Sequence, residues 1–225
     1  MSHESAPFET SHTAVERELL GRALPAGARV LEIGCGRTTR LADHRERIAW
    51  LVGVDVDGAA GRENPYLDRF VEADTCAELP FPDSCFDMVY ANFVVEHLRQ
   101  PCQAFCEWRR LLRPSGELVV LTSNVSNPLL RIARLLPQQV RATVKRYGAG
   151  AEGRDVYPAV YRANTVSVLS AALADAQFRP CELHTVATLH RYAGSHRRAA
   201  SALSAAERLL PSGRHSTIVA EFMAA

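Results

Sequence analysis

The chain has 225 residues, and its composition, 47% hydrophobic and 23% charged, is that of an ordinary globular protein. Its length favours a single α/β domain over residues 1–225 rather than two equal domains. The formal net charge is only +1 and the basic residues form no clustered tract, which argues against a nucleic-acid partner.

Neither a membrane span nor a secretion signal is evident in the sequence. No run approaches the roughly 18 apolar residues that a membrane helix needs, and the first 20 residues carry acids and histidines where a signal peptide is basic and then apolar. We therefore expect a cytoplasmic protein. Arginine supplies every basic residue except Lys145, which is typical of a GC-rich bacterial genome.

The six cysteines contain no Cys-x-x-Cys pair, so free thiols are expected, and no metal site is predicted. Cys102 and Cys106 are four residues apart and would share one face of a helix. Free cysteine usually behaves as a small buried hydrophobe, so we expect this pair to pack inside the protein.

In the first half of the chain, short apolar runs alternate with helical patterns. Helices are expected over Thr38–Ile48 and over Phe93–Leu112, the latter with an interruption near Pro101. A further short helix is expected after the strand that ends at Val54, and it should end near Asn64. The expected strands are Arg29–Ile33, Trp50–Val54, Arg69–Ala73, Cys85–Ala91 and Glu117–Thr122. This alternation predicts a doubly wound, mostly parallel, Rossmann-like sheet, which we expect to have seven strands.

The second half has a different pattern. Two short basic helices are expected in residues 127–147 and a helical segment near 190–210. A helix over Asn164–Ala176, with Asn164 as its N-cap, and strands at Phe178–Val186 and His215–Met223 complete the expectation. Residues 127–163 are interpreted as a helical lid inserted into the domain.

A glycine-containing junction between the first strand and the following helix indicates a ligand site. Gly34 and Gly36 follow the strand directly, and glycine lets a ligand approach the backbone closely. The second strand ends at Asp55, about 20 residues further on, where a carboxylate can accept hydrogen bonds from ribose hydroxyls.

At these positions the chain resembles class I S-adenosylmethionine-dependent methyltransferases, in particular the group that contains the ubiquinone-biosynthesis enzymes. VLEIGCG is similar to the first motif of that family, and VGVDVD to the end of its second strand. EADTCAELPFPDSCFDMVYANFVVEHL is similar to its third and fourth motifs, and LLRPSGELVVLT to its usual helix, Pro-Gly turn and fifth strand. The resemblance covers about residues 28–123.

The resemblance implies S-adenosylmethionine as cofactor and S-adenosylhomocysteine as product. It implies that Glu32 orders the glycine loop near the methionine amino group, that Asp55 binds the ribose, and that Asp74 faces the adenine. The full set of cofactor-binding residues expected in this way is Glu32, Gly34, Cys35, Gly36, Asp55, Val56, Asp74, Thr75, Cys76 and Asn92.

A nicotinamide dinucleotide is the rival ligand for such a fold. Its fingerprint has a third glycine at the position of Thr39, where the helix must pack close to the strand. The acid two residues before Gly34 also favours S-adenosylmethionine.

His97 is the candidate catalytic base because it follows the fourth strand and histidine is the side chain that most often acts as a general base. A role in packing alone stays open. Phe93, His97, Tyr157, Tyr161 and Arg162 are expected to contact the substrate, although the lid residues among them would also suit an aromatic hinge.

The sequence thus predicts an enzyme that methylates a small molecule, in secondary metabolism or in glycan or lipid biosynthesis, and acts as a monomer or homodimer. The alternative is a catalytically silent binding or regulatory subunit with the same fold. The intact glycine loop and the acids at 32 and 55 argue for cofactor binding but do not establish turnover.

Overall fold

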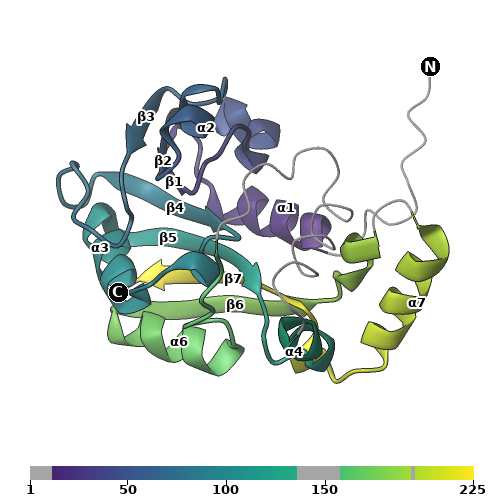
Figure 1. The fold of residues 1–225 in the computed structure, drawn as a ribbon. Coiled ribbons are helices and arrows are strands. Elements are labelled where there is room, and N and C mark those ends of the chain that lie inside the picture. Colours follow the sequence, from purple (N-terminus) through teal and green to yellow (C-terminus); the bar gives the residue numbers. More distant parts are fainter. Residues whose placement is uncertain (1–11, 136–157, 194–195) are drawn as a thin grey trace, which may run out of the picture.

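The computed structural model describes residues 12–135, 158–193 and 196–225 (Figure 1). Seven strands form one sheet in the order β3-β2-β1-β4-β5-β7-β6. The first five strands in sequence pair in parallel, and β7 runs antiparallel to both β5 and β6. The predicted seven-stranded, mostly parallel sheet is confirmed. Its strands are β1 Ala28–Ile33, β2 Ile48–Asp55, β3 Arg69–Glu72, β4 Phe86–Asn92, β5 Leu112–Ser123, β6 Phe178–Val186 and β7 Thr217–Ala224.

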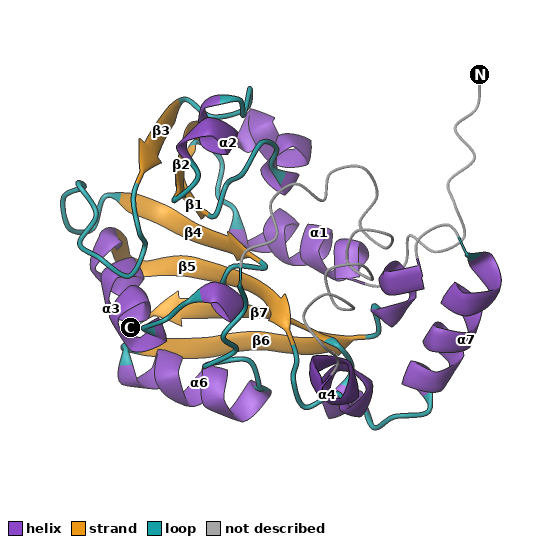
Figure 2. Ribbon diagram, in the orientation of Figure 1, coloured by secondary structure: helices purple, strands orange, loops and turns teal. Residues whose placement is uncertain are grey.

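Helices cover both faces of the sheet (Figure 2). The α-helices are α1 His12–Ala23, α2 Gly58–Arg62, α3 Pro101–Leu111, α4 Pro128–Leu135, α6 Val166–Asp175 and α7 Arg197–Arg208. The 3₁₀ helices are η1 Arg40–Arg47, η2 Val95–His97, η4 Leu189–Ala193 and η5 Ser212–Arg214.

Two apolar clusters hold these layers together. Side chains of α3 and α6, among them Trp108 and Leu173, pack on one face of the sheet. Leu19 and Leu20 of α1 pack on the other face, together with Leu41 of η1. The central strands are buried on both faces, which explains their continuous apolar sequence.

Several predicted boundaries differ from the structure. The helix expected over 38–48 is the 3₁₀ helix η1. The helix expected over 93–112 is two elements, η2 and α3, because Pro101 starts α3 at a position where a missing N–H costs nothing. β5 begins at Leu112, so the Pro-Ser-Gly segment lies inside the strand instead of preceding it.

Asn164 is not the cap of the helix that follows it. The side chain of Thr165 caps α6 by accepting a hydrogen bond from the backbone N–H of Val168 at 3.2 Å. Asn164 is buried, and its amide donates to the hydroxyl of Thr122 at 2.6 Å. It therefore ties the start of α6 to the end of β5.

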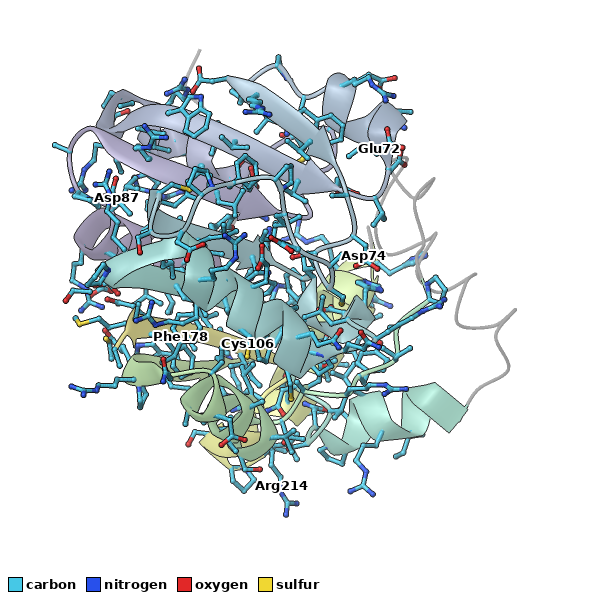
Figure 3. The ribbon with its side chains drawn as sticks, turned by 90° about the vertical axis from the view of Figure 1, so that its left-hand side faces the viewer. Glu72, Asp74, Asp87, Cys106, Phe178 and Arg214 are labelled. Carbon is cyan, nitrogen blue, oxygen red and sulfur yellow. The ribbon has the colours of Figure 1, made fainter. Side chains whose placement is uncertain are left out.

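The six cysteines are free, as expected, but the interpretation of Cys102 and Cys106 as buried is wrong. Both side chains are exposed on α3, and Figure 3 labels Cys106 on that helix. The buried positions of α3 are Ala104, Phe105, Trp108 and Leu111, so the cysteines occupy its solvent side.

A buried polar cluster fixes the C-terminal elements to the sheet. The carboxylate of Glu207, on α7, accepts hydrogen bonds from the backbone N–H groups of Ser216 (2.6 Å) and Leu189 (2.8 Å) and from the amide of Asn127 (3.2 Å). Asn127 also caps α4 through the N–H groups of Leu129 and Leu130. The carboxylate of Glu207 therefore joins the segments around residues 127, 189 and 216 to α7 by hydrogen bonds.

No helix in the described ranges has the length and apolarity that a membrane span requires.

Candidate functional site

The order of the strands creates a crevice at the carboxyl ends of β1 and β4. β2 and β3 lie on one side of β1, whereas β4 and β5 lie on the other, so the chain reverses direction across the sheet between β1 and β4. In open α/β sheets, ligands bind at such a switch point. The loops after β1, β2, β3 and β4 all meet there.

The glycine loop after β1 takes backbone conformations that favour glycine. Gly34 has a φ of +68° and Gly36 a φ of +49°. A Cβ at position 34 would lie 2.4 Å from Cγ2 of Val94, whereas one at position 36 would meet no atom within 4 Å. Gly34 therefore packs closely against Val94, which follows β4, whereas there is room for another group beside Gly36.

Asp55 connects the end of β2 to this loop. Its Oδ2 accepts a hydrogen bond from the N–H of Gly36 at 2.9 Å, and its Oδ1 accepts one from the N–H of Asp57 at 2.9 Å. Asn64 adds support, since its amide donates to the carbonyl of Cys35 at 3.1 Å. Each carboxylate oxygen of Asp55 keeps a lone pair for a further donor.

The side chains of Asp74 and Thr75 help to hold the loop after β3. Asp74, labelled in Figure 3, accepts one from the N–H of Cys76 at 2.9 Å. Thr75 is buried, and its hydroxyl accepts from the indole N–H of Trp108 at 2.7 Å. The Thr75 side chain therefore anchors the loop in the core.

Glu32, on β1, lies buried beneath the glycine loop. Its Oε1 accepts from the hydroxyl of Thr39 at 2.8 Å, while Oε2 is buried and has no hydrogen-bond partner among the described residues. Burial raises the pKa of Glu32 to about 8, and the nearby carboxylates of Glu16 and Asp55 add to the rise.

Beyond β4 the chain turns sharply at Phe93, whose φ is +54° and whose N–H donates to the carbonyl of Leu121 at 2.8 Å. Asn92 precedes this turn, and its buried Oδ1 has no partner among the described residues. His97 lies at the end of η2, with Nδ1 3.1 Å from the carbonyl oxygen of Pro158.

These loops surround a cavity of about 510 Å³. Ten of the residues predicted to form the site line it: Gly34, Gly36, Asp55, Val56, Asp74, Thr75, Cys76, Asn92, Phe93 and His97. These residues make up most of the cavity wall, and their role in binding a cofactor or substrate stays a prediction.

The other predicted site residues do not line the cavity or lie outside the described structure. Glu32 is buried beneath the glycine loop, and the Cys35 thiol is directed into the core, 2.6 Å from where a Cβ on Gly53 would be. Tyr161 and Arg162 follow Val160, which does line the cavity, but are not part of its wall. Tyr157 and most of the predicted lid fall within 136–157, outside the described residues.

Several lining residues were not predicted. Val94, Leu98 and Arg99 flank His97 and could have been found from their position after β4. Pro158 and Val160 reach the cavity from a segment 60 residues away in sequence, and no local pattern indicates that contact.

One further cluster could hold a metal ion, away from the cavity. The ligand atoms of Glu117, Cys181 and Glu221, on β5, β6 and β7, lie within 4.8 Å of one another. Arg22 approaches Glu221 at 3.5 Å and already supplies positive charge there. None of the three residues lines the cavity.

Comparison with known proteins agrees with this geometry. A family model described as a methyltransferase domain matches residues 31–120. A probable S-adenosylmethionine-dependent methyltransferase from Mycolicibacterium smegmatis is 36% identical over 120 residues, covering 50% of this chain and 44% of the relative. The ubiquinone/menaquinone biosynthesis C-methyltransferase UbiE of Hahella chejuensis is 36% identical over 123 residues, covering 47% of each chain. The matched region thus spans slightly less than half the length of these relatives.

Solved structures share the fold. The [4+2]-cyclase SpnF has a TM-score of 0.61 at 17% identity over 94% of this chain and 80% of its own. The geranyl diphosphate C-methyltransferase of Streptomyces coelicolor, solved with S-adenosyl-L-homocysteine, has a TM-score of 0.62 at 16% identity over 94% of this chain and 80% of its own. Residues 31–120 thus match a methyltransferase domain and are similar to S-adenosylmethionine-dependent methyltransferases, and the chain shares the fold of the solved neighbours.

Proposed function

We propose that this protein transfers a methyl group from S-adenosylmethionine to a small-molecule acceptor in the cytoplasm, as a monomer or homodimer. The main support comes from two unsatisfied acceptors, one on Asn92 in the cavity wall and one on Glu32 beneath the glycine loop. Oε2 of Glu32 and Oδ1 of Asn92 are buried and lack partners among the described residues, and native structures rarely leave such atoms unsatisfied. An ammonium group, like that of the methionine part of the cofactor, is a donor of the required kind.

The remaining cavity residues suit the other parts of the cofactor. The carboxylate of Asp55 can accept from the ribose hydroxyls while it holds the N–H of Gly36. Asp74 and the backbone of Thr75 and Cys76 provide polar groups for the adenine edge, and the exposed Val56 provides an apolar surface for its face. The open space beside Gly36 allows close approach to the backbone.

When bound, S-adenosylmethionine supplies an electrophilic methyl group, so the chain has only to position the acceptor and exclude water. Phe93, Val94, Pro158 and Val160 form an apolar wall beside His97. His97 takes the proton of the acceptor as the acceptor's electron pair bonds to the methyl carbon. His97 and the apolar wall would thus prepare the acceptor for a methyl group that S-adenosylmethionine would supply, with S-adenosylhomocysteine as the other product.

The fold by itself does not decide the reaction, because a cyclase shares it. Named relatives include a 27-O-demethylrifamycin SV methyltransferase and a trans-aconitate 2-methyltransferase, which supports a small-molecule acceptor. Among the described residues that line the cavity, Arg99 is the one Lys or Arg, so this part of the wall offers little positive charge to a nucleic-acid backbone.

Isothermal titration calorimetry with S-adenosylhomocysteine tests the proposal. We expect one site per chain, and no binding of NADH under the same conditions. Binding of NADH without binding of S-adenosylhomocysteine would overturn the assignment of the cofactor. A second assay, with labelled S-adenosylmethionine and an extract of small metabolites, distinguishes an enzyme from a silent binding subunit. The silent subunit would bind S-adenosylhomocysteine but would transfer no labelled methyl group to any compound in the extract.

A further inference from the structure

The 3₁₀ helix η2, which ends at His97, contacts the segment 158–164 beside the cavity. We call residues 158–164 the strap; it leads into α6 (Figure 2). The backbone carbonyl of Glu96, in η2, accepts hydrogen bonds from two consecutive strap N–H groups, those of Val160 at 2.8 Å and Tyr161 at 3.0 Å. Tyr161 takes a φ of +54° in this arrangement. The strap is therefore docked on the turn that carries His97.

The side chain of Glu96 fixes this turn to β5. Its carboxylate is buried and accepts from the hydroxyls of Thr122 at 2.8 Å and Ser123 at 3.0 Å. Within the described part of the chain no cation lies within ion-pair distance of it, so the two hydroxyls are the groups that hold it. A buried carboxylate that is paired only with neutral groups is costly, and such groups are usually retained for a specific arrangement.

The strap is attached to the same point from its other end. The amide of Asn164 donates to the hydroxyl of Thr122 at 2.6 Å and to the carbonyl of Ser123 at 3.2 Å. Thr122 therefore accepts from the strap and donates to Glu96. Both ends of the strap depend on one set of hydrogen bonds at the end of β5.

Docking of the strap decides which nitrogen of His97 carries a proton. Nδ1 lies 3.1 Å from the carbonyl oxygen of Pro158, at the start of the strap. A carbonyl oxygen can only accept, so Nδ1 must be the protonated nitrogen of the neutral ring. Nε2 is then the nitrogen that can take a proton.

We propose that Glu96 is a positioning residue, which docks the strap so that the carbonyl of Pro158 holds His97 as the Nδ1–H tautomer with a basic Nε2. This proposal rests on the proposed function, in which His97 accepts a proton. It also narrows the substrate class, because a base prepared in this way serves an acceptor whose nucleophile must lose a proton, such as a hydroxyl or an acidic carbon.

The tautomer can be measured without knowing the acceptor. Long-range ¹H–¹⁵N spectra of the labelled full chain distinguish Nδ1–H from Nε2–H, and hydrogen exchange reports on the N–H groups of Val160 and Tyr161. We expect the Nδ1–H form in the wild type. In Glu96→Gln one acceptor oxygen becomes a donor, so exchange at these two groups should be about tenfold faster and His97 should shift toward the Nε2–H form.

Thr122→Val is a second variant that removes the hydroxyl between the strap and Glu96 at nearly constant volume, and it should act in the same direction. Glu107→Gln is the matched control. It alters a carboxylate on α3 that accepts from the N–H of Leu79 at 2.8 Å and does not line the cavity, so neither readout should move.

An Nε2–H tautomer in the wild type would overturn the proposal. Unchanged exchange and an unchanged tautomer in both Glu96→Gln and Thr122→Val would overturn it as well. The affinity for S-adenosylhomocysteine should stay within about threefold of the wild type in both variants, because neither residue lines the cavity. Failure of the wild type to bind S-adenosylhomocysteine would instead overturn the proposed function, while the tautomer would still report whether Glu96 controls His97.

Discussion

The hydroxyl of Thr39 donates a 2.8 Å hydrogen bond to one oxygen of Glu32, and the other oxygen of that carboxylate is buried with no partner among the described residues. Burial raises the pKa of Glu32 to about 8, so the carboxyl group is largely protonated at pH 7. A bound ammonium group would favour the ionised form, and binding would then release a proton.

Glu32→Gln should therefore weaken the binding of S-adenosylhomocysteine by roughly tenfold or more, because hydrogen bonds to charged groups contribute about 1.5–3 kcal/mol. Calorimetry in two buffers of different ionisation enthalpy measures both affinity and proton release. Proton release should be seen in the wild type and be absent from the variant. Equal affinity of the two proteins would contradict the role assigned to Glu32.

The same substitution should stabilise the protein in the absence of ligand. The pKa of Glu32 is about 8 in the folded chain, whereas its ordinary value, which applies to the unfolded chain, is 4.5. Between pH 4.5 and pH 8 the folded state therefore binds more protons than the unfolded state. The contribution of Glu32 to stability is thus fully present below about pH 4.5 and is lost as the pH rises through 8. Since one pKa unit is about 1.4 kcal/mol, Glu32→Gln should be more stable than the wild type by a few kcal/mol at pH 8 and nearly equal to it at pH 4.5. Thermal unfolding at several pH values measures this effect. A difference in stability between the wild type and Glu32→Gln that did not change with pH would contradict the raised pKa of Glu32.

Asp55→Ala should lower the affinity for S-adenosylhomocysteine by about 1–3 kcal/mol, the cost of leaving ligand hydroxyls and the N–H of Gly36 without an acceptor. Asp57→Ala is the matched control. Asp57 caps α2 through the N–H groups of Ala59 and Ala60, so its loss should reduce stability by about 0.5–2 kcal/mol and leave affinity nearly unchanged. Similar losses of affinity in both variants would mean that Asp55 acts only by shaping the loop.

Gly34→Ala should both destabilise the chain and impair binding. Its φ of +68° costs a side chain about 1–2 kcal/mol, and the new Cβ would lie 2.4 Å from Cγ2 of Val94. Adding Val94→Ala removes the clash but not the backbone strain, so it should restore part of the stability. Gly21→Ala, in α1 with no atom within 4 Å of the new Cβ, should be neutral or stabilising by up to about 1 kcal/mol in denaturant unfolding.

His97→Ala should lower kcat by about 10²–10⁴-fold once an acceptor is known, while the affinity for S-adenosylhomocysteine stays nearly constant. His97→Gln keeps a hydrogen-bonding group but cannot take a proton at neutral pH, so it should be equally slow. If Gln restores most of the activity, His97 only orients the acceptor. Normal turnover in both variants would assign the residue to packing.

Glu207→Ala should destabilise the chain by about 2–4 kcal/mol, because it leaves three buried donors on separate segments without an acceptor. Arg208→Ala changes the neighbouring, exposed residue of α7 and should alter stability by less than about 0.5 kcal/mol. Chemical denaturation of the two variants gives the comparison, and equal midpoints would exclude the proposed role of Glu207.

Patterns within a few residues predicted the parallel strands and the residues on the glycine-loop side of the cavity. Buried parallel strands are continuously apolar, and the glycine loop needs glycine wherever its φ is positive. α1 was not predicted, because its buried face includes the polar His12 and Glu16 and so shows little apolar periodicity.

The side of the cavity around His97 depends on contacts between distant segments, which a single sequence does not encode locally. Asn164 and Thr165 are both good caps, and the position of Thr122, 42 residues before Asn164, determines which of them is used. The contact of His97 with Pro158 spans 61 residues. The residues around the glycine loop could thus be predicted from motifs, whereas the cavity wall around His97 required the fold.

The strand order also affects how the chain folds as it is synthesised. β7 is made after every other strand, yet it lies between β5 and β6. Until it emerges from the ribosome, β5 has an unpaired edge and β6 has no neighbour in the sheet. An open strand edge is a template for pairing with other chains. We therefore expect the yield of folded protein to fall when the synthesis of β7 is delayed. A chaperone that covers the exposed edge of β5 should raise that yield.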